Sequence, residues 1–132
     1  MHGETNLSVL LKTMTPELNE GEYVFCTIPP GQEIHPGKIV AFFREKEGVT
    51  IVLHKQDADS LHLSYQFIAA WITLTVHSSL AAVGLTAAFS KALADEGISC
   101  NVIAAYYHDH IFVAKSDAVK AMEVLRKLSV SF

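Results

Sequence analysis

The order of hydrophobic periods along residues 67–128 limits the fold of this chain more than any other feature. In FIAAWITLTV (67–76) every even position is apolar, which is the two-residue period of a strand with one buried face. From Gly84 the period becomes helical, and Gly97 stands where a left-handed C-cap would end that helix. The apolar stripe of this predicted helix consists of Leu85, Ala88, Phe89, Ala92 and Leu93.

Two further strands and a second helix are predicted after Gly97. Residues 98–107 alternate again, and HIFVA (110–114) predicts a third strand after a tight turn at His108 and Asp109. Ser116 is a suitable N-cap for the last helix. The apolar stripe of that helix contains Ala118, Met122, Leu125 and Leu128.

The predicted order is therefore strand, helix, strand, strand, helix. Right-handed crossovers turn this order into a ferredoxin-like βαββα unit of the α+β class, an antiparallel sheet with both helices on one face. Because no helix covers the other face, we expect this unit to pair with another copy.

The N-terminal half predicts a smaller companion unit. It begins with a short helix over residues 7–14, which ends before Pro16, followed by a strand over 22–28. A hairpin follows, with strands at 39–45 and 49–54, and then a helical turn near 56–61. These elements cannot bury both faces of a sheet alone, so we expect two tandem domains, residues 1–64 and 65–132.

Composition excludes several partners. The chain has ten basic and fourteen acidic residues and no Lys/Arg cluster, so we expect no nucleic-acid partner. The longest apolar run, 67–76, is too short to cross a bilayer, and the N-terminus lacks the pattern of a secretory signal. We therefore expect no membrane partner and a cytoplasmic location, with Cys26 and Cys100 reduced and packed in cores.

The candidates for metal binding and catalysis are weak. His108 and His110 share a strand face, but only His77 is available as a third ligand, so we expect no metal and no cofactor. Cys100 could meet either histidine across strands, yet alternation directs its thiol toward the helices, where it would be inert. We therefore predict no catalytic residue and no enzyme, with a small hydrolase or metalloenzyme as a minor alternative.

The residues from 83 onward carry a recognisable pattern. VGLTAAFSKALADEGISCNVIAAYYHDHIFV (83–113) resembles the ACT domain, in the form found in small bacterial proteins with two tandem ACT-like domains, in cytosolic arginine sensors and in aspartate kinases. FCTIPPG (25–31) and FREKEGVTIVL (43–53) look like the companion domain. The resemblance implies a regulatory module that assembles side by side into dimers and holds amino acids at the interface.

That resemblance gives Gly84 a possible role in ligand binding. A glycine at the start of a helix lets the backbone come close to an anion, and the unpaired N–H groups there favour a carboxylate. Carbonyl groups of residues 101–103 and the Asn101 side chain could accept from the α-ammonium group. The alternative is that Gly84 only lets the helix pack tightly on the sheet. The predicted ligand-binding residues are Ser79, Leu80, Ala82, Val83, Gly84, Leu85, Asn101, Val102 and Ile103.

The sequence thus predicts a small regulatory protein that binds an amino acid or a similar small metabolite at an interface between two ACT units. We expect a homodimer or a higher homo-oligomer. The alternative is a dimeric structural or protein-interaction module without a ligand. The loop 77–85 contains no charged residue apart from the partial charge of His77, so the sequence does not identify the amino acid.

Overall fold

The computed structural model describes residues 6–76 and 82–130. The chain forms two compact units: residues 1–20 together with 70–132, called here the terminal unit, and residues 21–69, called the central unit. The first twenty residues therefore belong with the C-terminal half of the chain. The domain boundary between residues 64 and 65 stays a prediction, because compact units and family domains need not share their limits.

The terminal unit contains the predicted strand, helix, strand, strand, helix order. Its elements are β5 (Ile68–Thr75, which begins in the central unit), α3 (Leu85–Asp95), β6 (Asn101–Ala104), β7 (Asp109–Ala114) and α4 (Ala118–Val130). Strand β7 lies between β5 and β6. The predicted α+β class and the ferredoxin-like arrangement are confirmed.

Three boundaries differ from the prediction. Strand β6 is shorter than 98–107, because the Ile98 amide donates to the Leu93 carbonyl in the C-cap of α3. At its other end, Ala105 N–H donates to the His108 carbonyl, so the turn precedes Asp109, which already lies in β7. Ser116 is not the N-cap of the last helix, because it lies within a 3-10 turn, η2 (Lys115–Asp117).

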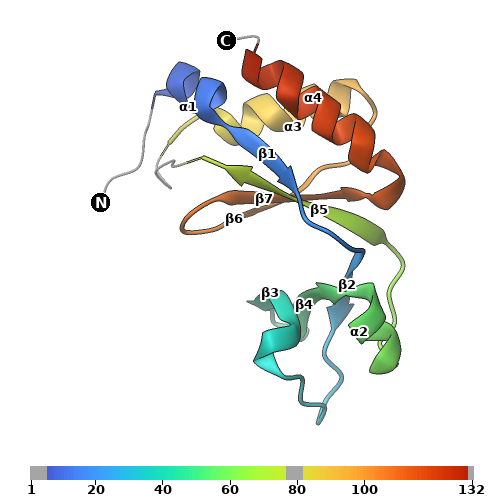
Figure 1. Cartoon of the computed structure of the whole chain (residues 1–132). Coiled ribbons are helices and arrows are strands. Elements are labelled where there is room, and N and C mark those ends of the chain that lie inside the picture. The colour runs from blue at the N-terminus through green and yellow to red at the C-terminus, as the bar shows by residue number, and fades with distance from the viewer. Residues whose placement is uncertain (1–5, 77–81, 131–132) are drawn as a thin grey trace. The chain divides into compact units, whose positions relative to one another are not determined.

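One face of the terminal sheet carries the main hydrophobic core. Even-numbered residues of β5 and odd-numbered residues of β7 face helices α1, α3 and α4, as strand alternation requires. Figure 1 shows these three helices on the same side of the strands of this unit. Fully buried members of the core include Leu10, Ile72, Phe89, Ile111 and Leu125.

The N-terminal segment adds a helix and a strand to this unit. Helix α1 (Leu7–Thr13) begins at Asn6, whose side chain accepts from the Val9 amide at 3.2 Å. Strand β1 (Thr15–Leu18) then pairs antiparallel with β5, with Thr15 opposite Thr75. The sequence pattern does not predict this strand, because Pro16 indicates only the end of the preceding helix. A proline is tolerated in a strand that pairs along one side alone.

The central unit is smaller. It consists of β2 (Tyr23–Thr27), a 3-10 turn η1 (Pro36–Lys38), β3 (Ile39–Arg44), β4 (Val49–His54), helix α2 (Lys55–Ser60) and the first residues of β5. The predicted hairpin is confirmed: β3 and β4 are antiparallel, and β4 also pairs with β2. Its small core contains Val24, Cys26, Ile51, Leu53, Ala58 and Leu63. Within residues 6–76 and 82–130, no helix has the length and hydrophobicity needed to cross a membrane.

Candidate functional site

The start of helix α3 is an uncapped helix N-terminus. Gly84 is the N-cap and has no side chain to accept from the first turn, and the first helical bond runs from the Ala88 amide to the Gly84 carbonyl at 2.9 Å. The amides of Leu85, Thr86 and Ala87 therefore have no acceptor within the helix. The first turn contains no acidic residue. This end of α3 can donate hydrogen bonds to an anion, and the helix dipole favours a negative charge there.

Gly84 also has a packing role. Its φ of 100° lies in the left-handed region, which side chains other than hydrogen rarely allow. A Cβ atom built on Gly84 would lie 3.1 Å from Cδ2 of Leu7 in helix α1. The close approach that the glycine permits here is an approach of α1 to α3, whereas the packing alternative from the sequence named the sheet.

Replacing Gly84 by alanine is expected to destabilise the terminal unit by about 1–2 kcal/mol from the left-handed conformation alone. The Leu7 contact adds to this cost. In urea denaturation, the double variant Gly84→Ala with Leu7→Ala should therefore lose less stability than the sum of the two single variants. A Gly84→Ala protein as stable as the wild type would contradict the described backbone conformation.

The remaining predicted loop residues have different environments. Ala82 is half-buried against the core, Val83 is 83 % exposed, and Leu85 is 3 % exposed within the core. Ser79 and Leu80 lie outside the described residues, as does His77. Leu85 therefore offers a ligand its backbone N–H and not its side chain.

The predicted strand residues lie on β6. Asn101 donates from Nδ2 to the Phe112 carbonyl at 3.1 Å, which fixes its amide and leaves Oδ1 as an acceptor. Val102 packs against the core, and Ile103 is half-buried opposite His110. Among the described residues, no hydrogen bond joins this strand to the start of α3, although Val102, Leu85 and Ala82 all pack in or against the same core.

A polar cluster on the helix-free face of the terminal sheet was not predicted. The Trp71 indole Nε1 donates to His110 Nδ1 at 3.0 Å, and Thr73 Oγ1 lies 3.2 Å from the same nitrogen. Asn19 Nδ2 in turn donates to Thr73 Oγ1 at 2.9 Å. Alternation places Trp71 and His110 on one face, but no sequence rule indicates that their side chains bond.

The Trp71 bond determines the chemistry of His110. An indole N–H only donates, so His110 Nδ1 must accept and the imidazole proton sits on Nε2. A metal bound at Nε2 would move that proton to Nδ1. The Nδ1 proton would then face the Trp71 indole N–H, and two donors cannot hydrogen-bond to each other. In the described part of the chain, His, Cys, Asp and Glu nowhere form a group of three suited to a metal ion.

Burial shifts two pKa values beside this cluster in opposite directions. Burial is the main cause that lowers the pKa of His110, and the nearby His108 lowers it further. Burial also raises the pKa of Asp109, although His110 and His108 partly oppose this shift. Both shifts are in the direction that favours the neutral form of the group.

These shifts predict a pH dependence of stability. Because the folded pKa of His110 is lowered, its contribution is present above the unfolded pKa of about 6.5 and is lost as pH falls below that value. The raised pKa of Asp109 acts with the opposite sign, adding stability only once its carboxyl group is protonated at lower pH. Urea denaturation between neutral pH and about pH 5.5 should show the His110 loss, and the loss should be smaller in His110→Gln. Equal slopes in both proteins would contradict the assignment.

The two cysteines are free. Burial is the main cause that raises the pKa of both thiols, and Cys100 packs against the main core, as strand alternation predicted. Thiols with raised pKa values are poor nucleophiles at neutral pH.

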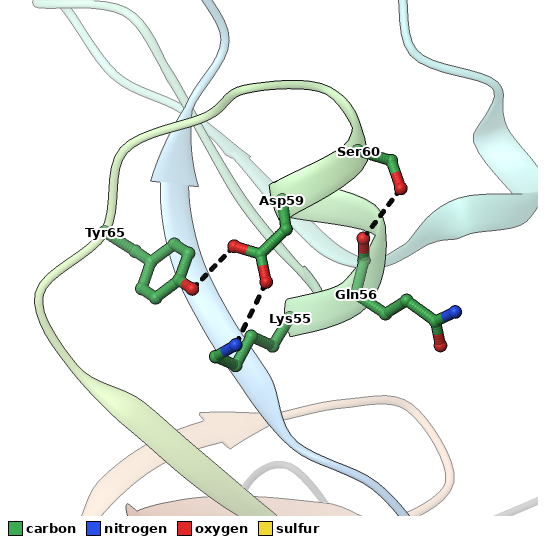
Figure 2. Close-up of polar contacts among 5 residues, drawn as sticks. All are labelled: Lys55, Gln56, Asp59, Ser60 and Tyr65. Atoms are coloured by element: carbon green, nitrogen blue, oxygen red, sulfur yellow. Dashed lines mark hydrogen bonds and ion pairs between the residues drawn. The ribbon is translucent and has the colours of Figure 1, made fainter.

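A second polar cluster lies on the surface of the central unit. Figure 2 shows Asp59 accepting from the Tyr65 hydroxyl at 2.6 Å and from Lys55 Nζ at 3.0 Å. The Tyr65 hydrogen bond is the main cause that lowers the pKa of Asp59, followed by the Lys55 hydrogen bond. The Lys55–Asp59 ion pair is largely accessible to solvent, and such a pair contributes little to stability. Lys55 and Asp59 are among the residues that line a cavity of about 510 Å³.

Comparison with known proteins agrees with this fold. Residues 2–70 and residues 66–127 each match a model of the ACT domain. A crystal structure of a Vibrio cholerae protein of unknown function, described as a possible transport protein, is 48 % identical, with a TM-score of 0.83 over 93 % of this chain and 95 % of that one. No curated protein has a matching sequence.

More distant structures share the fold alone. An Agrobacterium tumefaciens protein has 17 % identity and a TM-score of 0.66, covering 88 % of this chain and 89 % of that one. The ligand-free regulatory subunit of aspartate kinase from Thermus thermophilus has 11 % identity and a TM-score of 0.63, covering 89 % and 97 %. With two successive matches that together span nearly its whole length, the chain belongs to the ACT-domain family.

Proposed function

We propose that this protein is a regulatory module that binds an amino acid by its α-carboxylate at the N-terminus of α3 and catalyses no reaction. The observation that carries the proposal is the uncapped first turn of α3, in which the amides of Leu85, Thr86 and Ala87 have no acceptor within the helix and no acidic side chain is present. Membership of the ACT family, and the likeness to a regulatory subunit of aspartate kinase, support a regulatory role.

The α-ammonium group of such a ligand needs acceptors, and β6 is the proposed source. Asn101 Oδ1 and the backbone carbonyls of residues 101–103 have suitable chemistry. Strand β6 is the last strand in its sheet, so a second copy can approach it. We therefore propose a cytoplasmic homodimer or higher homo-oligomer with the ligand at an interface between ACT units.

Regulation would follow from differential affinity. A ligand held between two copies stabilises the arrangement that contains the complete site, and shifts the equilibrium only by its preference for that arrangement. The regulated target would then be another protein that recognises one of the two arrangements.

A second candidate function is a dimeric interaction module without a ligand. The close approach of Leu7 to Gly84 favours this second function, because tight packing alone would then explain why a glycine is needed there. Two neighbouring tyrosines, Tyr106 and Tyr107, are 74 % and 69 % exposed in the turn between β6 and β7 and could form part of a protein contact.

Two variants of the exposed residue Thr86 distinguish these functions. Thr86→Glu places a carboxylate in the first turn of α3, where it competes with an anionic ligand, whereas Thr86→Gln has nearly the same size without the charge. Thermal unfolding is measured for each protein against a panel of amino acids, with light scattering to follow oligomeric state.

The proposal expects one or a few amino acids at about one hundred times Kd to stabilise the wild type by about 2.7 kcal/mol, a rise in Tm of about ten degrees. Thr86→Gln should keep this response and Thr86→Glu should lose it while staying folded. If no amino acid stabilises the wild type and the oligomer persists, the interaction module is the better account.

A further inference from the structure

The central unit contains a pocket at the point where two paired strands separate. Strands β2 and β5 are paired only where Tyr23 lies opposite Ala69 and Val24 lies opposite Ile68. Beyond Val24, β2 continues to Thr27 without β5 as its neighbour. A cavity of about 580 Å³ opens there, a size typical of small-molecule sites. This strand-edge pocket is lined by Phe25, Cys26, Thr27, Thr50, Ser64, Tyr65, Gln66 and Phe67.

The backbone of β2 supplies hydrogen-bonding groups to this pocket. The Ile28 amide donates to the Val49 carbonyl at 3.0 Å, so the even-numbered residues of β2 carry the bonds to β4. In an antiparallel ladder the intervening residues direct their peptide groups to the opposite side. The N–H and C=O of Thr27 are therefore directed toward the strand-edge pocket, beyond the last residue that β5 covers.

The polar side chains add acceptors and donors. The hydroxyls of Thr27 and Thr50 donate to a backbone carbonyl and a carboxylate of the same unit, which leaves their oxygen atoms as acceptors for an occupant. Ser64 and Gln66 are exposed, and each offers both a donor and an acceptor. An occupant thus meets both donors and acceptors among the lining residues.

Three aromatic residues are among the lining residues. Phe25 and Phe67 belong to the two chain segments that separate here, and the Tyr65 ring lies with them in the lining. The Tyr65 hydroxyl donates to Asp59, and Lys55 Nζ donates to the same carboxylate (Figure 2). Asp59 is not a lining residue, so the bond that fixes the Tyr65 ring lies outside the pocket. Rings contributed by both segments favour a flat molecule over a branched one.

None of the eight lining residues belongs to the charged types Asp, Glu, Lys, Arg or His. A charged ligand would lose hydration there without an opposite charge to replace it. We propose that the strand-edge pocket binds an uncharged, flat heterocycle with donors and acceptors along its rim, of the nucleobase class. This site lies in the central unit, apart from the start of α3, so the chain would respond to two chemically different ligands.

The test is a titration of the full chain with adenosine, guanosine, cytidine and uridine, followed by amide NMR. Gln66→Ala removes the side-chain amide from the rim, and Gln56→Ala makes the same change at an exposed glutamine of α2 outside the pocket. Both positions are exposed, so neither change should affect folding.

The proposal expects saturable shifts at residues 25–27 and 64–67 with at least one nucleoside. Gln66→Ala should raise the Kd about tenfold, the effect of losing one hydrogen bond, while Gln56→Ala should bind as the wild type does. The absence of saturable shifts with all four nucleosides at millimolar concentration would overturn the proposal, and so would equal affinity in Gln66→Ala. Neither result bears on amino-acid binding, which is read at Leu85, Thr86 and Ala87.

Discussion

Replacing Phe89 by alanine is expected to lower the free energy of unfolding by about 3–5 kcal/mol. Phe89 is fully buried in α3 and belongs to the core that joins three helices to the terminal sheet. Truncation removes the transfer free energy of the ring and leaves a cavity that surrounding side chains fill only in part. Urea denaturation with an unchanged m-value would measure this loss.

The matched control for this change is Phe43→Ala. Phe43 lies on β3 and is 70 % exposed, so the same atoms are removed with little change in burial. We expect a change of less than about 1 kcal/mol. Similar losses in the two variants would contradict the burial of Phe89.

Replacing Leu11 by alanine is expected to cost about 2–5 kcal/mol, although this residue lies near the chain's N-terminus. Leu11 is fully buried in α1, which packs against α3 and α4 in the terminal unit. A helix that belonged to an independent N-terminal domain would instead affect the central unit. Whether Leu11→Ala destabilises the terminal unit or the central unit therefore tests to which unit helix α1 belongs.

Hydrogen exchange locates that loss. In Leu11→Ala, amides of α3 and α4 should exchange faster, while amides of β2 and β4 keep their protection. Leu18→Ala is the control, because Leu18 is 42 % exposed on β1 and its truncation leaves no buried cavity. Faster exchange confined to β2 and β4 would show that α1 does not support the terminal unit.

Much of the terminal unit could be predicted from local patterns. Alternation along 67–76 and the helical stripe after Gly84 reflect burial on one face, which a sequence records directly. Gly97 was identified as the cap, and its φ of 73° and the bond from the Ile98 amide to the Leu93 carbonyl confirm this.

Features that depend on distant segments were not predictable in the same way. Strand β1 is four residues long and contains Pro16, and it becomes a strand only because β5 lies beside it. The bond between Trp71 and His110 likewise needs two strands in register, and Leu7 meets Gly84 only after α1 joins the terminal unit. The uncapped start of α3 could be predicted, because Gly84 has no side chain to cap it.

The most direct test of amino-acid binding at α3 is an amide NMR titration with the amino acid that gives the largest thermal stabilisation. If the α-carboxylate binds at the helix start, the amides of Leu85, Thr86 and Ala87 should show the largest saturable downfield shifts, because each gains a charged acceptor. Saturable binding that leaves these three amides unmoved would contradict the account.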